Sequence, residues 1–409
     1  MKVYPAEDVG MSSARLGRIN DYLEREIAGN KLPGMIVVAQ RRGKVIHYST
    51  QGLMDIEAGR PMEADALFRI YSMTKPIISL AIMMLHDEGR LQLHDPVAKY
   101  IPGIGKMKVF SHVSDRAPQF VGQDPPMTVF HLLTHMSGFP SGNDPFHPAD
   151  RLFQESSESH GFYHRDMSLE RLIDHFCDLP LKFQPGGDWN YGVSTDVLGY
   201  LLQVIADMPL ADFLKRKIFA PLGMIDTAFH VPQEKVQRLA QIYNSDAACG
   251  SQLIAPEDVA LGDVRKPTRC PSGSGGLVSS TSDYLRFANM LINGGELDGA
   301  RIVSPMTIKR MTANAVPRAY LPLRAGVERY GYGFGLGFRV MLDLGQANGY
   351  SSLGEYGWAG AAATYFVIDP REELIILLMT QNWSVQQPYP PRSIVPNLVY
   401  QAIDDLNQA

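Results

Sequence analysis

The sequence predicts an α/β protein, an α+β sandwich in which a central antiparallel sheet flanked by helices is interrupted by an inserted, mostly helical domain. Strand-like runs gather near both ends of the chain, helical patterns among Pro- and Gly-rich loops fill its middle, and 409 residues exceed one ordinary domain. We expect residues 1–70 and 271–409 to form a discontinuous α/β domain and residues 71–270 to form the helical domain. A cleft at the seam between them is the expected active site.

The first segment predicts a helix followed by a hairpin. Ser12 can cap a helix whose apolar residues recur at helical spacing from Leu16 to Ile27. Short strands are expected at residues 35–40 and 44–50, joined by a turn. A helix beside paired strands is typical of an α/β layer.

The middle of the chain begins with a buried helix. The run Ile77–Glu88 is apolar on almost every face, which predicts burial on all sides. The segment 141–167 mixes serines, histidines and aromatic residues, and we expect it to be a long surface loop. Further helices are expected at 128–135, 168–178, 194–207 and 210–219.

The last third returns to alternating helix and strand. Residues 280–283 have the pattern of a helix cap before a helix over 284–292. Strands are expected at 334–342, 360–368 and 374–380, and a final helix at 393–406.

The composition excludes several classes of protein. A hydrophobic fraction of 45%, a charged fraction of 20% and a net charge of -5 indicate a globular chain without the basic surface that nucleic acid requires. Three cysteines make no disulfide framework or zinc pattern. Because no apolar run reaches membrane length and the first residues do not resemble a secretion signal, we expect a soluble, cytoplasmic protein that binds neither nucleic acid nor membrane. Its oligomeric state stays open.

Two further patterns have a structural interpretation. His131 and His135 have the spacing of two metal ligands on one helix face, but the Glu of a zinc peptidase motif is missing. We interpret them as packing residues and expect no metal site. The glycines of 331–337 lack the strand and helix of a dinucleotide-binding loop, and we expect a tight turn there and no cofactor.

Ser72-x-x-Lys75 is the candidate catalytic motif. It lies where a strand-like run meets the buried helix, so the Lys amine can approach the Ser hydroxyl from one helix face. A serine at a helix N-terminus has free backbone N–H groups beside it that can hold an oxyanion. The spacing alone is common by chance, and its alternative is a capping Ser with a solvent-exposed Lys.

Three other segments support a catalytic interpretation. The aromatic loop 187–194 contains Tyr191, which could share a proton with Ser72. The glycine-rich turn 273–277 allows unusual backbone angles or close packing. Trp358-Ala359-Gly360-Ala361 is expected to begin a strand whose small residues let a substrate lie against its edge.

With these motifs, the sequence resembles the serine β-lactamase and penicillin-binding-protein superfamily, and within it the class C-like family VIII carboxylesterases. The resemblance extends from about residue 12 to 400 and includes LFRIYSMTKP at 67–76, HLLTHMSGF at 131–139, PGGDWNYG at 185–192 and the long run at 273–299. It implies a β-lactamase/transpeptidase-like fold.

The resemblance also implies roles for individual residues. Ser72 matches the acylated nucleophile, Lys75 the base that activates it, and Tyr191 a general base or proton relay. Trp358 and Gly360 occupy the place of the third, Lys-Thr-Gly-like motif. The backbone N–H groups of Ser72 and Ala361 would form the oxyanion hole.

Two departures from the superfamily's motifs favour an esterase. Val193 stands where the second motif usually has Asn, and Trp358 replaces the Lys of the third motif. A cation at this motif helps to bind the carboxylate of β-lactams and peptidoglycan stems. Trp358 therefore favours an apolar, uncharged ester, and we expect a serine carboxylesterase acting on short-chain acyl esters, a small-molecule substrate.

Three alternatives stay open at this point. The same scaffold could pass the acyl group to an alcohol as an acyltransferase. It could also act as a β-lactamase or DD-peptidase with weak β-lactam turnover. A non-catalytic binding protein is disfavoured because Ser72, Lys75 and Tyr191 are all present.

Overall fold

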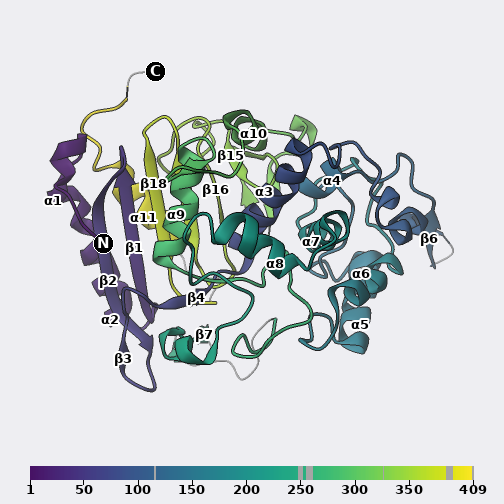
Figure 1. Ribbon diagram of the computed structural model, residues 1–409, viewed down its shortest axis with the longest axis horizontal. Helices are drawn as coiled ribbons and strands as arrows, with labels where there is room; N and C mark the ends of the chain where they lie inside the picture. Colours follow the sequence, from purple (N-terminus) through teal and green to yellow (C-terminus); the bar gives the residue numbers. More distant parts are fainter. Residues whose placement is uncertain (115–116, 247–251, 255–260, 326, 384–389, 408–409) are drawn as a thin grey trace.

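Strands from both ends of the chain form one antiparallel sheet. The computed structural model describes residues 1–409 except 115–116, 247–251, 255–260, 326, 384–389 and 408–409. Figure 1 shows N-terminal strands beside the C-terminal β18. The eight strands have the order β14 (Tyr332–Phe334), β15 (Arg339–Met341), β16 (Tyr356–Ala359), β17 (Tyr365–Asp369), β18 (Leu374–Met379), β1 (Gly34–Arg41), β2 (Lys44–Asp55) and β3 (Arg60–Pro61).

Helices cover both faces of this sheet, which explains why its central strands are apolar at nearly every position. In β1, Ile36 and Val38 belong to the large core shared with α3 (Thr74–Asp87) and α9 (Thr281–Ile292). Their neighbours in β1 point to the opposite face, because side chains alternate along a strand. There they pack against α1 (Ser13–Leu16), α2 (Arg18–Ala28) and α11 (Pro391–Tyr400).

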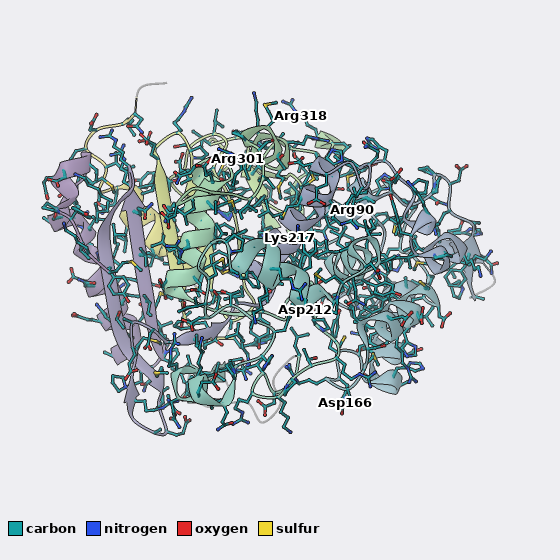
Figure 2. The ribbon with its side chains drawn as sticks, viewed as in Figure 1. Arg90, Asp166, Asp212, Lys217, Arg301 and Arg318 are labelled. Atoms are coloured by element: carbon teal, nitrogen blue, oxygen red, sulfur yellow. The ribbon has the colours of Figure 1, made fainter. Side chains whose placement is uncertain are left out.

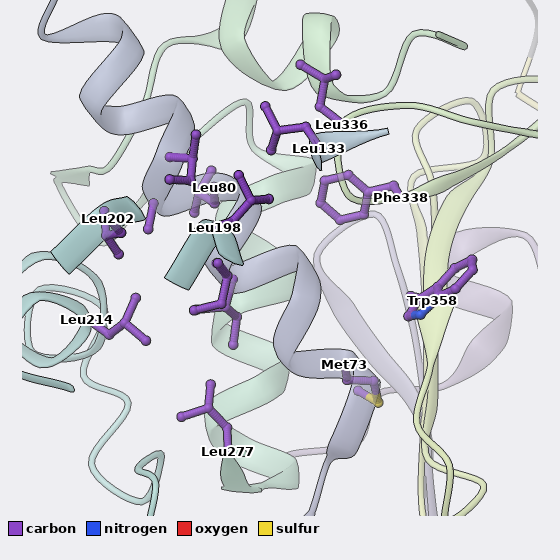
Figure 3. Close-up of a cluster of buried hydrophobic side chains, with 14 of the residues drawn as sticks. Met73, Leu80, Leu133, Leu198, Leu202, Leu214, Leu277, Leu336, Phe338 and Trp358 are labelled. Carbon is purple, nitrogen blue, oxygen red and sulfur yellow. The ribbon is translucent and has the colours of Figure 1, made fainter. Parts of the chain in front are cut away.

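The middle of the chain is helical, as predicted, and fills the right half of Figure 1. Its core is continuous with the core on the inner face of the sheet, and Figure 3 shows leucines of α3 and α7 meeting there. The remaining helices are α4 (Val129–Leu133), α5 (Pro148–His160), α6 (Leu169–Cys177), α7 (Ser194–Ala206), α8 (Leu210–Leu214) and α10 (Pro305–Met311).

Short strand pairs complete the fold. They are β4 (Leu67–Arg69) with β9 (Val278–Ser280), β5 (Val109–Ser114) with β6 (Ala117–Val121), β7 (Asn244–Asp246) with β8 (Gln252–Ile254), β10 (Glu296–Leu297) with β11 (Ala300–Arg301), and β12 (Leu323–Ala325) with β13 (Val327–Arg329). Figure 2 labels exposed charged side chains such as Arg90, Lys217 and Arg318, of which Arg318 lies at the upper edge of the view. No single helix of the described ranges has the length and apolar character to cross a membrane, and only the bent pair Ser194–Ala206 with Leu210–Phe219 does so when joined.

The pair β4–β9 positions the candidate site. Phe68 lies opposite Ser279 and Arg69 opposite Val278 in this ladder. Because Ser72 follows β4 and the glycine-rich turn 273–277 precedes β9, the ladder brings the two segments together. The chain then enters α3 directly.

Three sequence-based element predictions are wrong. The segment 141–167 is not one loop, because Pro148 starts α5 with His147 as its cap and Phe153 is buried beneath it. The run 334–342 is a hairpin of β14 and β15 with Gly337 at a positive φ of 94° between them. The run 360–368 is also not one strand, because β16 ends at Ala359 and β17 begins at Tyr365, so Trp358 and Ala359 end a strand instead of beginning one. The assignment of residues 71–270 to a separate domain stays a prediction.

Candidate active site

Ser72 lies in a tight turn between β4 and α3. The turn Tyr71–Met73 is a 3-10 helix that continues into α3 at Thr74. The N–H of Ile70 donates to the carbonyl of Leu277 at 3.0 Å, which ties the turn to the strand pair beneath it. Tyr71 has a φ of 42°, in the left-handed region that a bulky residue adopts only when its surroundings impose it. The half-buried Ser72 side chain is thereby presented at the N-terminal end of α3.

Lys75 reaches back to this serine from the first turn of α3. Its Nζ lies 3.1 Å from Ser72 Oγ and donates to the Ser274 carbonyl at 2.8 Å. Within the described part of the chain, no carboxylate forms an ion pair with Lys75. The side chain is 4% exposed, so the structure excludes the solvent-exposed lysine of the alternative interpretation. An amine in this position can accept the hydroxyl proton of Ser72.

Tyr191 faces the same lysine from the loop before α7. The Lys75 Nζ lies 4.7 Å from the centroid of the Tyr191 ring, over its face. The indole Nε1 of Trp358 donates to the Tyr191 hydroxyl at 3.1 Å. Trp358 thus touches the second motif directly, a contact that the sequence did not reveal.

His135 packs against the ring of Tyr191, and within the described residues it belongs to no group of three or more potential metal ligands. The two rings lie 4.9 Å apart, and the carbonyl of His135 accepts from the N–H of Asn190 at 2.9 Å. Burial, reinforced by nearby Lys75, lowers the pKa of the imidazole to about 3, so the ring is neutral at ordinary pH. His131 instead caps α4, where its Nδ1 accepts from the N–H of Thr128 at 3.2 Å.

Gly360 brings the end of β16 against the turn of Ser72. A Cβ at this glycine would collide with the Ile70 carbonyl and the Thr364 hydroxyl, so only glycine allows the close approach. Trp358 is buried in β16, whereas Ala361 is exposed in the turn that follows. Figure 3 shows Trp358 on its strand across from Met73 at the start of α3.

The structure brings all six predicted site residues together. Ser72, Tyr191, Trp358, Gly360 and Ala361 line one pocket of about 150 Å³, and Lys75 contacts Ser72 beneath it. Their catalytic roles stay predictions. The pocket brings a hydroxyl, an amine, a phenol and backbone N–H groups to one space, which is a set suited to acyl transfer.

Sequence reasoning missed a buried carboxylate that organises the glycine-rich turn. Asp196 in α7 accepts from the Ser272 hydroxyl at 2.7 Å, from the Ser274 N–H at 3.0 Å and from the Tyr163 hydroxyl at 2.8 Å. Gly273 packs so closely on α7 that a Cβ would collide with the Thr195 carbonyl. Asp196 therefore holds the turn whose Ser274 carbonyl accepts from Lys75. An acidic residue in an otherwise apolar helix was the available signal.

The sequence interpretation also missed three arginines. Arg329, Arg339 and Arg392 line the same pocket as Ser72. Arg329 and Arg339 are ten positions apart, Arg392 lies 53 positions beyond Arg339, and none of them belongs to a motif, so only the fold brings the three together.

Comparison with known proteins places these motifs in a family. The family model described as Beta-lactamase matches residues 19–394. The chain belongs to the β-lactamase family. Esterase EstB of Burkholderia gladioli is 30% identical over 387 residues, which cover 92% of each chain. The resemblance to the β-lactamase-fold esterases is thus confirmed, and the chain is a serine hydrolase by family.

Two other similarities fit this assignment. Lovastatin esterase of Penicillium rubens is 26% identical over 363 residues, covering 84% of this chain and 87% of that protein. The solved structure "EstCE1, a hydrolase with promiscuous acyltransferase activity" aligns with a TM-score of 0.78 and 23% identity, over 96% of this chain and 99% of the other. This likeness confirms the predicted fold. The β-lactamase-fold relatives thus include proteins named as esterases.

Proposed function

We propose that this protein is a serine carboxylesterase that hydrolyses short-chain acyl esters through an acyl-enzyme on Ser72. The observation that carries the proposal is the contact of Lys75 Nζ with Ser72 Oγ at 3.1 Å, within a pocket that Tyr191 and Ala361 also line. EstB and lovastatin esterase support an ester as the substrate.

The reaction begins when Ser72 Oγ attacks the ester carbonyl and its proton passes to Lys75. The carbonyl oxygen becomes an oxyanion, which the N–H groups of Ser72 and Ala361 would stabilise. Collapse of this intermediate expels the alcohol, which takes a proton from Lys75 or Tyr191. Water then attacks the acyl-enzyme, the same groups accept its proton, and the acid leaves as Ser72 regains its hydrogen.

The contacts of Lys75 suit the role of a base. Its Nζ contacts a hydroxyl, a carbonyl and an aromatic ring, so within the described residues no carboxylate ties the ammonium form into an ion pair. The Ser274 carbonyl fixes the direction of the Lys75 amine, because it accepts a hydrogen bond from one N–H of that amine. The indole N–H of Trp358 fixes the Tyr191 hydroxyl from the other side of the hydrogen bond, because it donates to the hydroxyl oxygen.

The test is hydrolysis of p-nitrophenyl acetate and butyrate by the wild type and Ser72→Ala. Loss of the nucleophile should lower kcat by about 10⁴-fold or more. Ser111→Ala, an exposed serine of β5, is the matched control and should keep wild-type activity. Undiminished turnover by Ser72→Ala would overturn the proposal.

Product analysis separates hydrolysis from acyl transfer, which shares the acyl-enzyme. Butyl ester formed in the presence of 1-butanol, in excess over butyric acid, would indicate an acyltransferase. Nitrocefin separates the β-lactamase alternative. Because Val193 and Trp358 replace the polar residues of the β-lactam motifs, its turnover should be far slower than that of the esters.

A further inference from the structure

Three guanidinium groups converge on the pocket of Ser72. Arg329 ends β13, Arg339 lies in β15 and Arg392 lies at the start of α11, and all three line the cavity of about 150 Å³ with Ser72 and Trp358. Arg329 lies over the indole of Trp358, with its Cζ 5.8 Å from the ring centroid. The indole in turn donates to the Tyr191 hydroxyl, so only the Trp358 side chain separates the Arg329 guanidinium from the phenol of Tyr191.

Among the described residues, Arg339 is the only one of these three cations with a carboxylate partner. The buried Arg339 donates to Glu355 Oε1 at 2.7 Å and to the Tyr365 hydroxyl at 2.7 Å. Arg329 and Arg392 are half-buried, and no described carboxylate lies within 4.0 Å of either. Within the part of the chain that the structure describes, these two positive charges of the pocket wall therefore have no fixed counter-charge.

Burial and the positive charges of the pocket lower the pKa of Arg329. Burial, together with the neighbouring cations Arg339 and Arg392, lowers the pKa of Arg329 to about 10, and burial also lowers the pKa of Arg392. Both groups stay protonated near neutral pH. Gathering like charges in a half-buried wall destabilises the fold unless an anion offsets them. A carboxylate is a suitable anion, because guanidinium groups bind it with two parallel hydrogen bonds.

We propose that the preferred ester carries a carboxylate, which Arg329 and Arg392 bind beside Trp358 while Ser72 attacks the ester carbonyl. This inference rests on the proposed esterase function and names its substrate class. Trp358 alone, in place of the Lys of the third motif, would favour an uncharged ester. The cations of this pocket come instead from β13, β15 and α11.

The first test compares charged and neutral esters of equal length. The mono-p-nitrophenyl ester of adipic acid places a carboxylate on the acyl side, and its methyl-capped counterpart is neutral. Acetylated 3-hydroxybenzoic acid and its methyl ester do the same on the alcohol side. We expect kcat/KM to favour the charged member of at least one pair by tenfold or more at low salt, and 0.5 M NaCl should reduce this preference.

The second test removes the cations one at a time. Arg392→Gln and Arg329→Gln should each lower the charged-to-neutral ratio of kcat/KM by about tenfold, chiefly through KM. Arg318→Gln is the matched control, because Arg318 is exposed and labelled at the outer surface in Figure 2. This control should keep the wild-type ratio. Because each arginine is replaced in a separate variant, one variant can still test the proposal if the other misfolds. The salt dependence of the charged-ester preference is measured on the wild type and does not depend on any variant.

The outcomes separate this inference from the function on which it rests. Ser72-dependent hydrolysis with equal or lower kcat/KM for the charged member of both pairs would overturn the carboxylate site and leave the esterase intact. A charged-ester preference that survives both substitutions would also overturn it. Absence of Ser72-dependent hydrolysis for every ester would instead overturn the proposed function.

Discussion

At the scale of single residues, the site depends on the Ser72 hydroxyl, the Lys75 amine and the Tyr191 phenol, which few other side chains can replace. Ser72 and Lys75 could be proposed as a catalytic pair from their spacing together with three supporting segments, and the roles of Tyr191 and Ala361 were implied by the resemblance of the motifs. The hydrogen bond between Trp358 and Tyr191 could not be predicted, because it joins residues 167 positions apart. The same holds for the pocket arginines, whose burial depends on the final fold.

Trp358→Phe tests the role of the indole N–H. The ring keeps its packing, but the Tyr191 hydroxyl loses the donor at 3.1 Å. One neutral hydrogen bond contributes about 1 kcal/mol, so kcat should fall roughly fivefold. Steady-state kinetics with p-nitrophenyl butyrate measures this effect. Trp383→Phe, which alters an indole packed edge-to-face against Tyr71, is the control for the loss of an indole elsewhere. An unchanged kcat in Trp358→Phe would contradict the positioning of Tyr191 by the indole.

Gly360→Ala tests the close approach of β16 to the serine turn. The added methyl group would collide with the Ile70 carbonyl and Thr364, which forces the two segments apart. Overpacking of this kind costs about 1–3 kcal/mol. We expect a lower melting temperature and a fall in kcat of at least tenfold. Gly59→Ala, at an exposed turn with open space around it, should leave kcat unchanged. Wild-type kcat for Gly360→Ala would show that the approach is not needed.

At the scale of elements, the strand pair β4–β9 and the helix α7 assemble the site. The sequence identified the central strands and most helices, because hydrophobic periodicity reports burial. It misplaced the hairpins around Gly337 and Gly360, since a continuous apolar run does not mark a turn within it. It also missed α5, whose buried face is only a few residues wide.

Asp196 connects α7 to the turn that holds Lys75. Asp196→Ala removes the acceptor for three hydrogen bonds and should release the turn at Ser274. We expect kcat to fall by about 10- to 100-fold, together with a lower melting temperature, because charge-assisted bonds contribute about 1.5–3 kcal/mol each. Asp196→Asn keeps the shape and an acceptor oxygen, so it should recover most of the activity. Equal losses in both variants would indicate that the negative charge, rather than the anchoring of the turn, is required.

At the scale of the whole molecule, the fold holds His47, His131 and His135 in neutral form at buried or half-buried positions. Burial lowers the pKa of His47 and His131 to about 4 and, with Lys75, that of His135 to about 3. The unfolded chain binds protons on these groups near pH 6.5, whereas the folded chain does not. The stabilisation they give is therefore present above pH 6.5 and is lost as the pH falls toward 4.

His47→Gln isolates one of these contributions. Each buried histidine should lower the free energy of unfolding by up to about 1.4 kcal/mol per pH unit between pH 6.5 and 4. Urea unfolding at pH 7, 6 and 5 should show a smaller loss of stability on acidification for His47→Gln than for the wild type. An identical loss in the two proteins would contradict a neutral, buried His47.

The central claim is that Ser72 forms a covalent acyl-enzyme with the help of Lys75. Incubation with a fluorophosphonate, followed by intact-mass and peptide mass spectrometry, tests it most directly. The wild type should gain one adduct located on Ser72, Lys75→Ala should react at least 100-fold more slowly, and Ser72→Ala should not react. Stoichiometric labelling at another residue, or equal labelling of Ser72→Ala, would contradict the account.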